Sequence, residues 1–103
     1  MPGNPLLAGL RPTHPGEILR EDVFPALGRT KVEIARLLGV SRGALYKILD
    51  EKTPITPQMA LRIGKLTGSR PELWLDLQRS YDLKIAEKAI GKKVAKIPTL
   101  KAA

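Results

Sequence analysis

The residues of this chain best suited to chemistry lie in the segment Thr30–Asp50. Arg42 and Lys47 carry cationic groups that can pair with phosphates or guanine edges, and Tyr46 can stack or donate its hydroxyl hydrogen. No acidic residue stands between Glu33 and the end of the segment, so this stretch does not repel a polyanion. These residue types indicate a nucleic-acid contact. The residues expected to make it are Thr30, Lys31, Ser41, Arg42, Gly43, Ala44, Tyr46, Lys47 and Lys52.

Arg42 is expected to read a base or a phosphate, because it would stand in the first turn of a helix that enters the groove. Gly43 and Ala44 have almost no side chain, which favours close approach of the backbone, or a thymine methyl contact at Ala44. The alternative for Gly43 is simple tolerance, at a cost of roughly 1 kcal/mol in helix propensity. Thr30 and Ser41 are expected first as helix caps, whose groups can also meet phosphate.

Two short helices joined by a tight turn must position these side chains. Thr30 is a good N-cap, and a glutamate three residues on completes a capping box, which predicts a helix over 31–38. Gly39 then supplies the positive φ angle of the turn. Ser41 is the expected N-cap of a second helix, which runs to about residue 49.

The apolar residues of the segment predict how the two helices pack. Ala35 is small enough to let a second helix cross close to it, and Val40 would plug the turn into the core. The side chains expected to face inward are Ile34, Leu37, Leu38, Leu45, Ile48 and Leu49. This spacing is typical of a helix-turn-helix. The alternative is a helical hairpin that contacts only proteins.

A further helix is predicted before this hairpin. It should begin at Pro15, because a proline in the first helical position loses no hydrogen bond. Pro25 is expected to end or kink it, and Gly28 should close the following turn. His14, the single histidine, is expected to serve the helix start, since catalysis or metal binding would need partners that the sequence lacks.

Two more helices are predicted after the hairpin. The first should open with Thr56 as its N-cap and stop at Gly68. The second should be capped by Ser69, place Trp74 in the core and end at Gly91. No stretch sustains the two-residue alternation of a strand, so the predicted fold class is all-α with five helices.

Length and charge agree with one small basic domain. The 103 residues carry a net charge of +8, from 18 Lys and Arg against 10 Asp and Glu. Half of this excess lies in 29–49 and half in 91–103, which favours a polyanionic partner. The predicted organisation is a flexible N-terminal arm over 1–12, a folded domain over 13–90 and a basic disordered tail over 91–103.

Several classes of function are disfavoured by what the sequence lacks. It contains no cysteine, no apolar run near the roughly 20 residues that span a bilayer, and no signal-peptide pattern. It also shows no glycine-rich phosphate loop, nucleophile–base set or metal-ligand spacing. We therefore predict a cytoplasmic protein that is not an enzyme and has no cofactor, no metal and no membrane partner.

Four stretches of the chain together resemble the HigA-type antitoxins, also called the VapI group of the Xre/Cro-like helix-turn-helix superfamily. They are HPGEIL at His14–Leu19, GVSR at Gly39–Arg42, PITPQMALRIGKLTGS at Pro54–Ser69 and PELWLDLQRSYDL at Pro71–Leu83. The resemblance covers about residues 11–90. It departs from the family at Asp50–Lys52, where members often have an Asn-Gly turn.

The resemblance implies a five-helix bundle of the lambda-repressor-like type that forms a homodimer. It implies that the helix over 41–49 reads the major groove of an inverted-repeat operator upstream of the protein's own operon. It further implies a partner, a HigB-type toxin that cleaves mRNA on the ribosome, and a bacterial protein found on the nucleoid when bound to its operator. Two alternatives stay open: a solitary or phage-type regulator without a toxin, and a toxin-sequestering module that does not read DNA.

Overall fold

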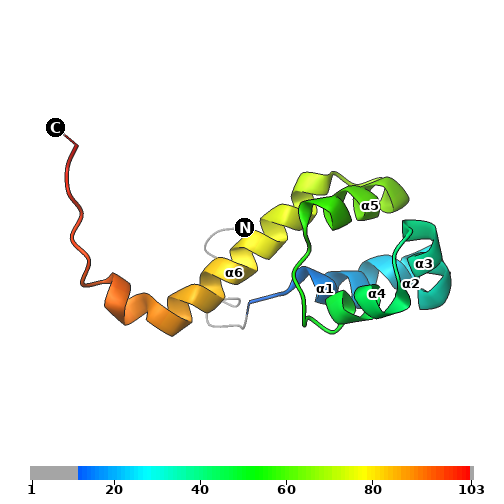
Figure 1. Cartoon of the computed structure of the whole chain (residues 1–103), viewed down its shortest axis with the longest axis horizontal. Coiled ribbons are helices and arrows are strands. Elements are labelled where there is room, and N and C mark those ends of the chain that lie inside the picture. Colours follow the sequence, from blue (N-terminus) through cyan, green and yellow to red (C-terminus); the bar gives the residue numbers. More distant parts are fainter. Residues whose placement is uncertain (1–11, 103) are drawn as a thin grey trace.

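The computed structural model describes residues 12–102, which form helices joined by short turns and contain no strand (Figure 1). The helical elements are α1 (Pro15–Ile18), the π-helical turn η2 (Leu19–Val23), α2 (Phe24–Leu27), α3 (Lys31–Leu38), α4 (Arg42–Leu49), α5 (Pro57–Thr67) and α6 (Pro71–Val94). Because α1, η2 and α2 are continuous, they count as one helix, and the predicted all-α fold with five helices is confirmed. The predicted arm over 1–12 lies, except for its last residue, outside the described range.

The first helix starts as predicted but passes through Pro25. The Nδ1 atom of His14 accepts a hydrogen bond of 2.9 Å from the backbone N–H of Gly16, so the histidine side chain caps the helix. The prediction that Pro25 ends or kinks the helix was wrong about an end, because α2 continues to Leu27. The irregularity is instead the η2 turn before it, where the wider winding accommodates a proline that cannot donate.

The central hairpin has the caps and the turn that the sequence predicts. The Oγ atoms of Thr30 and Ser41 accept hydrogen bonds from backbone N–H groups three residues on, at 3.1 and 3.0 Å. Gly39 ends α3 at a φ of 75°, a left-handed conformation that glycine adopts readily. The N–H of Val40 then donates to the carbonyl of Ala35 at 3.1 Å, which closes the turn. Local hydrogen bonds therefore close the turn that joins α3 to α4.

The core lies between the helices and is mostly aliphatic, with Phe24 and Trp74 as its aromatic members. Ile34, Ala35, Leu38, Leu45, Ile48 and Leu49 are all buried, as predicted for the hairpin. The prediction for Leu37 was wrong, because its side chain is 49% exposed. In a helix of eight residues the core side is already filled by Ile34, Ala35 and Leu38, and Leu37 lies beyond the edge of that stripe.

The start of α6 differs from the prediction. Its N-cap is Arg70, which makes no side-chain cap, and Ser69 is not the cap. The Ser69 hydroxyl instead accepts a hydrogen bond of 2.8 Å from the indole Nε1 of Trp74. Trp74 is 2% exposed, so its predicted place in the core is confirmed. A buried indole N–H needs a hydrogen-bond acceptor, and the Ser69 hydroxyl serves as that acceptor instead of capping α6.

The end of α6 also differs from the prediction, because the helix passes through Gly91 and ends at Val94. Gly91 has no positive φ angle, and Lys92 and Lys93 in the last turn interact favourably with the helix dipole. The helix packs on α5 and the first helix and then extends away from the bundle (Figure 1). The predicted tail over 91–103 therefore begins with helical residues. None of the described helices is both long and apolar enough to cross a membrane.

Candidate nucleic-acid interface

One face of α4 is exposed and the other is part of the core. Leu45, Ile48 and Leu49 are buried, whereas the predicted site residues of this helix are all exposed. These exposed residues are Arg42, Gly43, Ala44, Tyr46 and Lys47. The apolar residues recur at spacings of three and four, so packing them inward turns the basic and small residues outward.

The N-terminal end of α4 is open to a ligand. The N-cap hydroxyl of Ser41 is engaged by the N–H of Ala44, and the next two residues, Arg42 and Gly43, are exposed. A Cβ atom added at Gly43 would have no atom within 4 Å. Because N–H groups in the first turn of a helix have no partner within it, this end can approach a phosphate or a base closely.

The nine predicted site residues do not all line one hollow. Ser41, Gly43, Ala44 and Lys47 border one shallow hollow between α4 and the loop before α5. Thr30 and Lys31 border a separate hollow at the start of α3, and Arg42 and Tyr46 line neither of them. Together these positions span the N-terminal ends of α3 and α4 and the outer face of α4. This extent suits a long ligand better than a small one.

Lys52 joins this surface from the turn after α4. Its backbone N–H donates to the carbonyl of Lys47 at 2.8 Å, so the main chain of the turn folds back onto the end of the helix, and both lysines are exposed. The turn depends on Glu51, the one non-glycine residue of the described range with a positive φ angle, at 63°. Glycine would adopt this angle at a lower cost, which agrees with the Asn-Gly turn of the resembling family.

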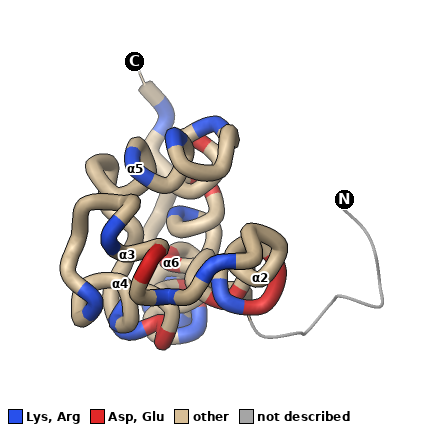
Figure 2. The backbone as a smooth tube through the Cα atoms, turned by 90° about the vertical axis from the view of Figure 1, so that its right-hand side faces the viewer, with Lys and Arg blue, Asp and Glu red and all other residues tan. Residues whose placement is uncertain are grey.

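The charges around α4 are mostly free to act on a ligand. In residues 12–102 no carboxylate lies within ion-pair distance of Arg42 or Lys47. Arg29 and Arg36, by contrast, pair with Glu33 at 3.2 and 3.8 Å. Basic segments occur on and around α4, and acidic segments occur both near α2 and beside α3 and α4 (Figure 2). The exposed helix therefore presents a positive field toward solvent.

Sequence reasoning missed the residues that hold α4 in place. Arg20 donates through Nη1 to the carbonyl of Leu49 at 2.5 Å and to the Glu51 carboxylate at 3.3 Å, which satisfies the C-terminal end of α4. A Cβ atom at Gly16 would lie 2.0 Å from the Ile48 carbonyl oxygen, so only glycine lets the two helices meet. Gly16 stands inside the HPGEIL stretch, and that resemblance was its only signal.

Gln78 is a second residue that the sequence did not single out. It is 6% exposed, and its Oε1 accepts a hydrogen bond of 2.9 Å from the N–H of Ile55. Its Nε2 donates to the Asp82 carboxylate at 3.0 Å. The buried amide thus fastens the loop after α4 to α6. A polar residue four positions after Trp74, on the same side of the helix, was the available signal.

The helix α3, the tight turn at Gly39 and the exposed basic helix α4 together have the arrangement of a helix-turn-helix motif. The helix-turn-helix family model matches residues 19–75, and the chain belongs to this family.

Similar proteins show which members of the helix-turn-helix family this chain resembles. Virulence-associated protein I of Dichelobacter nodosus is 40% identical over 74 residues, which cover 72% of this chain and 68% of that protein. The solved structure of Pseudomonas aeruginosa antitoxin HigA with the higBA promoter is 35% identical, with a TM-score of 0.83 over 88% of this chain and 100% of that one. Antitoxin GraA in complex with its operator is 39% identical, with a TM-score of 0.83 over 91% and 96%. The predicted resemblance to HigA-type antitoxins is confirmed.

Proposed function

We propose that this protein is a sequence-specific DNA-binding repressor that reads the major groove with α4 and acts as the antitoxin of a HigB–HigA type pair. The observation that carries the proposal is the exposed basic face of α4, held on a helix-turn-helix. The solved structures of HigA with a promoter and of GraA with an operator support it. In this proposal Arg42 reads a base or phosphate, and Lys31, Lys47 and Lys52 contact the DNA backbone.

The proposed assembly on DNA is a homodimer. Two copies of α4 would lie about 34 Å apart, one turn of the double helix, and would require an inverted repeat. The proposed dimer surface is α6, because its second half is exposed and carries apolar side chains. These side chains are Leu83, Ile85, Ile90 and Val94.

The operator proposal is tested by titrating a DNA fragment from the protein's own promoter with wild type and with Arg42→Ala. We expect the substitution to weaken operator binding by about 1–3 kcal/mol at fixed salt. Arg70→Ala is the matched control, because it removes the same charge at the start of α6, away from α4. The affinity of this variant for the operator should equal that of the wild-type protein. Equal affinities for Arg42→Ala and wild type would remove Arg42 from the site.

The toxin partner is the second part of the proposal, supported by the antitoxin names of the structural neighbours. The test is the neighbouring reading frame: a small basic protein encoded immediately upstream should form a stable complex with this chain in size-exclusion chromatography. If the upstream protein fails to bind while operator binding is intact, the protein is a solitary or phage-type regulator. If the toxin binds and the promoter fragment does not, the protein is a sequestering module.

A further inference from the structure

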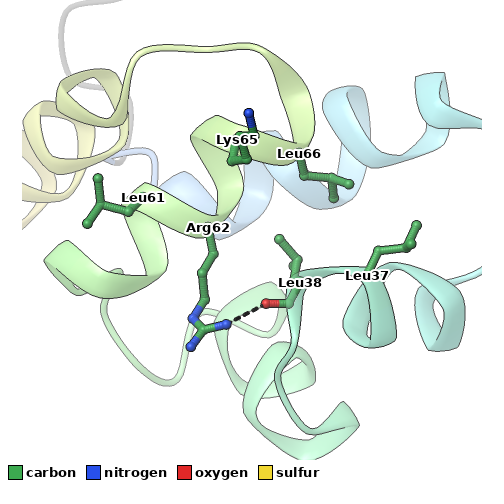
Figure 3. A pocket seen from close by; sticks show the side chains of 6 residues that line it. All are labelled: Leu37, Leu38, Leu61, Arg62, Lys65 and Leu66. Atoms are coloured by element: carbon green, nitrogen blue, oxygen red, sulfur yellow. Dashed lines mark hydrogen bonds between the residues drawn. The ribbon is translucent and has the colours of Figure 1, made fainter.

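A groove lined with leucines lies between α3 and α5 and includes none of the exposed residues of α4 (Figure 3). Its lining consists of Leu37, Leu38, Leu61, Arg62, Lys65 and Leu66. Leu37 and Leu61 are 49% and 62% exposed, and they lie at opposite ends of the groove with Leu38 and Leu66 between them (Figure 3). Covering apolar surface of this kind is favourable because it removes that surface from water.

Two cations stand beside these leucines. Arg62 donates through Nη1 to the carbonyl of Leu38 at 2.7 Å, which fixes the stem of its side chain across the groove (Figure 3). Lys65 follows one turn later on α5. Within the range that the structure describes, neither cation is paired with a carboxylate. The groove therefore offers an apolar floor together with positive charge that is not neutralised.

We propose that this groove binds an acidic amphipathic segment of a partner protein. An apolar side chain of the segment would insert between Leu37 and Leu61, and its carboxylates would pair with Arg62 and Lys65. A nucleic acid fits less well, because half-exposed leucines offer nothing to a phosphate backbone.

A second copy of this chain also fits less well. The end of α6 carries several of the exposed apolar residues that a second copy could offer, and the charged residues among them are mainly lysines. These lysines are Lys84, Lys88, Lys92 and Lys93. They would meet Arg62 and Lys65 with like charge, which is unfavourable. Charge complementarity therefore selects an acidic partner.

The test uses the full chain labelled with ¹⁵N and a synthetic helical peptide with leucines on one face and glutamates beside them. We expect the peptide to shift the backbone amide signals of Leu37, Leu61 and Lys65. Leu61→Glu and Lys65→Glu should each weaken its binding about tenfold. A matched peptide has lysines in place of the glutamates. Its affinity for the Lys65→Glu protein should be higher than its affinity for the wild-type protein.

Leu73→Glu is the control variant, because Leu73 is an exposed leucine on α6, 46% exposed, outside the groove. It should leave peptide binding unchanged. Equal binding of the two peptides, or shifts confined to α4 or α6, would overturn the proposal. So would Leu61→Glu converting a dimer to a monomer in sedimentation, which would make the groove a contact between copies. Because the assay contains no DNA, its outcome is independent of the proposed operator binding.

Discussion

At the scale of single residues, two helical glycines have opposite tasks. A Cβ atom at Gly16 would collide with the Ile48 carbonyl oxygen at 2.0 Å, whereas at Gly43 it would meet no atom within 4 Å. Gly16 is therefore required for the packing of α1 against the end of α4. Gly43 has no packing reason for its small size, and the structure leaves its exposed position free for a ligand.

Alanine at each of these glycines should give opposite changes in stability. Gly16→Ala should lower the free energy of unfolding by about 2–3 kcal/mol, because α4 must shift to make room. Gly43→Ala should raise it by up to about 1 kcal/mol, through helix propensity. Urea denaturation measures both. Gly43→Ala should also weaken operator binding if the backbone of α4 enters the groove closely, and unchanged affinity would leave Gly43 as a tolerated residue.

His14 links the stability of the first helix to pH. Burial lowers the pKa of His14 below its ordinary value, against the raising effects of Glu51, of a hydrogen bond to the Thr53 backbone and of Asp82. The ring also makes an edge contact with Tyr81, with the ring centroids 4.9 Å apart. Because Nδ1 accepts from Gly16 N–H, the fold favours the neutral imidazole.

The sign of the pH effect follows from this lowered pKa. The stabilisation that the buried, neutral His14 gives the fold is fully present above the unfolded-state pKa of about 6.5. It is lost as the pH falls below that value, because the unfolded chain then binds more protons than the folded one. We expect the free energy of unfolding to decrease between about pH 7.5 and pH 5. His14→Asn, which retains a capping group without titrating in this range, should show a smaller decrease. Identical pH profiles for the two proteins would contradict this role.

At the scale of elements, α4 owes its position to bonds from distant parts of the chain. Arg20 donates to the carbonyl of the last residue of α4, and Gln78 accepts a hydrogen bond from the loop that follows α4. Arg62 donates to the last carbonyl of α3, directly before the turn that leads into α4. An eight-residue helix is marginal on its own in water. These long-range bonds and the buried leucines keep the exposed face of α4 in one orientation. A helix that binds in a DNA groove needs such a fixed orientation.

The end of α6 and the residues after it form the second basic element. Replacing Lys92, Lys93, Lys96 and Lys101 with glutamine removes their charge and preserves the chain length. If these lysines neutralise phosphates, the slope of log affinity against log salt should fall by about 0.9 for each phosphate that the variant leaves without a lysine. Operator titrations at several salt concentrations measure it. An unchanged slope would show that this end only aids solubility.

At the scale of the whole molecule, α6 and the residues after it reach beyond the bundle, and the extents of the structure are 52 × 34 × 23 Å (Figure 1). Leu83, Ile90 and Val94 are about half exposed on the projecting part, at 56%, 47% and 48%. Side chains of this size usually gain a covering surface, and a two-fold copy of the same helix supplies one. The shape thus supports the proposed dimer through α6.

Charges placed on this helix should separate the proposed dimer. The double substitution Leu83→Glu and Ile90→Glu should yield monomers in sedimentation equilibrium and weaken operator binding, because two half-sites must then be filled independently. The fold should persist, since neither side chain belongs to the core. Circular dichroism checks this point. A dimer that survives both substitutions would place the interface elsewhere.

The sequence by itself determined the features that depend on neighbours in the chain. The caps at Thr30, Ser41 and Thr56 and the left-handed glycines at the helix ends follow from hydrogen bonds over three or four residues. Such local signals gave the number of helices, their class and the exposed face of α4. The stretches resembling the antitoxins added the family.

Only the tertiary structure decided what each side chain meets across the fold. Periodicity placed Leu37 in the core, yet it borders an open groove, and Ser69 serves Trp74 instead of capping α6. Gly16, Arg20 and Gln78 gain their roles from partners more than twenty residues away in the chain. Pairings at such separation depend on the angles between packed helices, and no local spacing in the sequence encodes those angles.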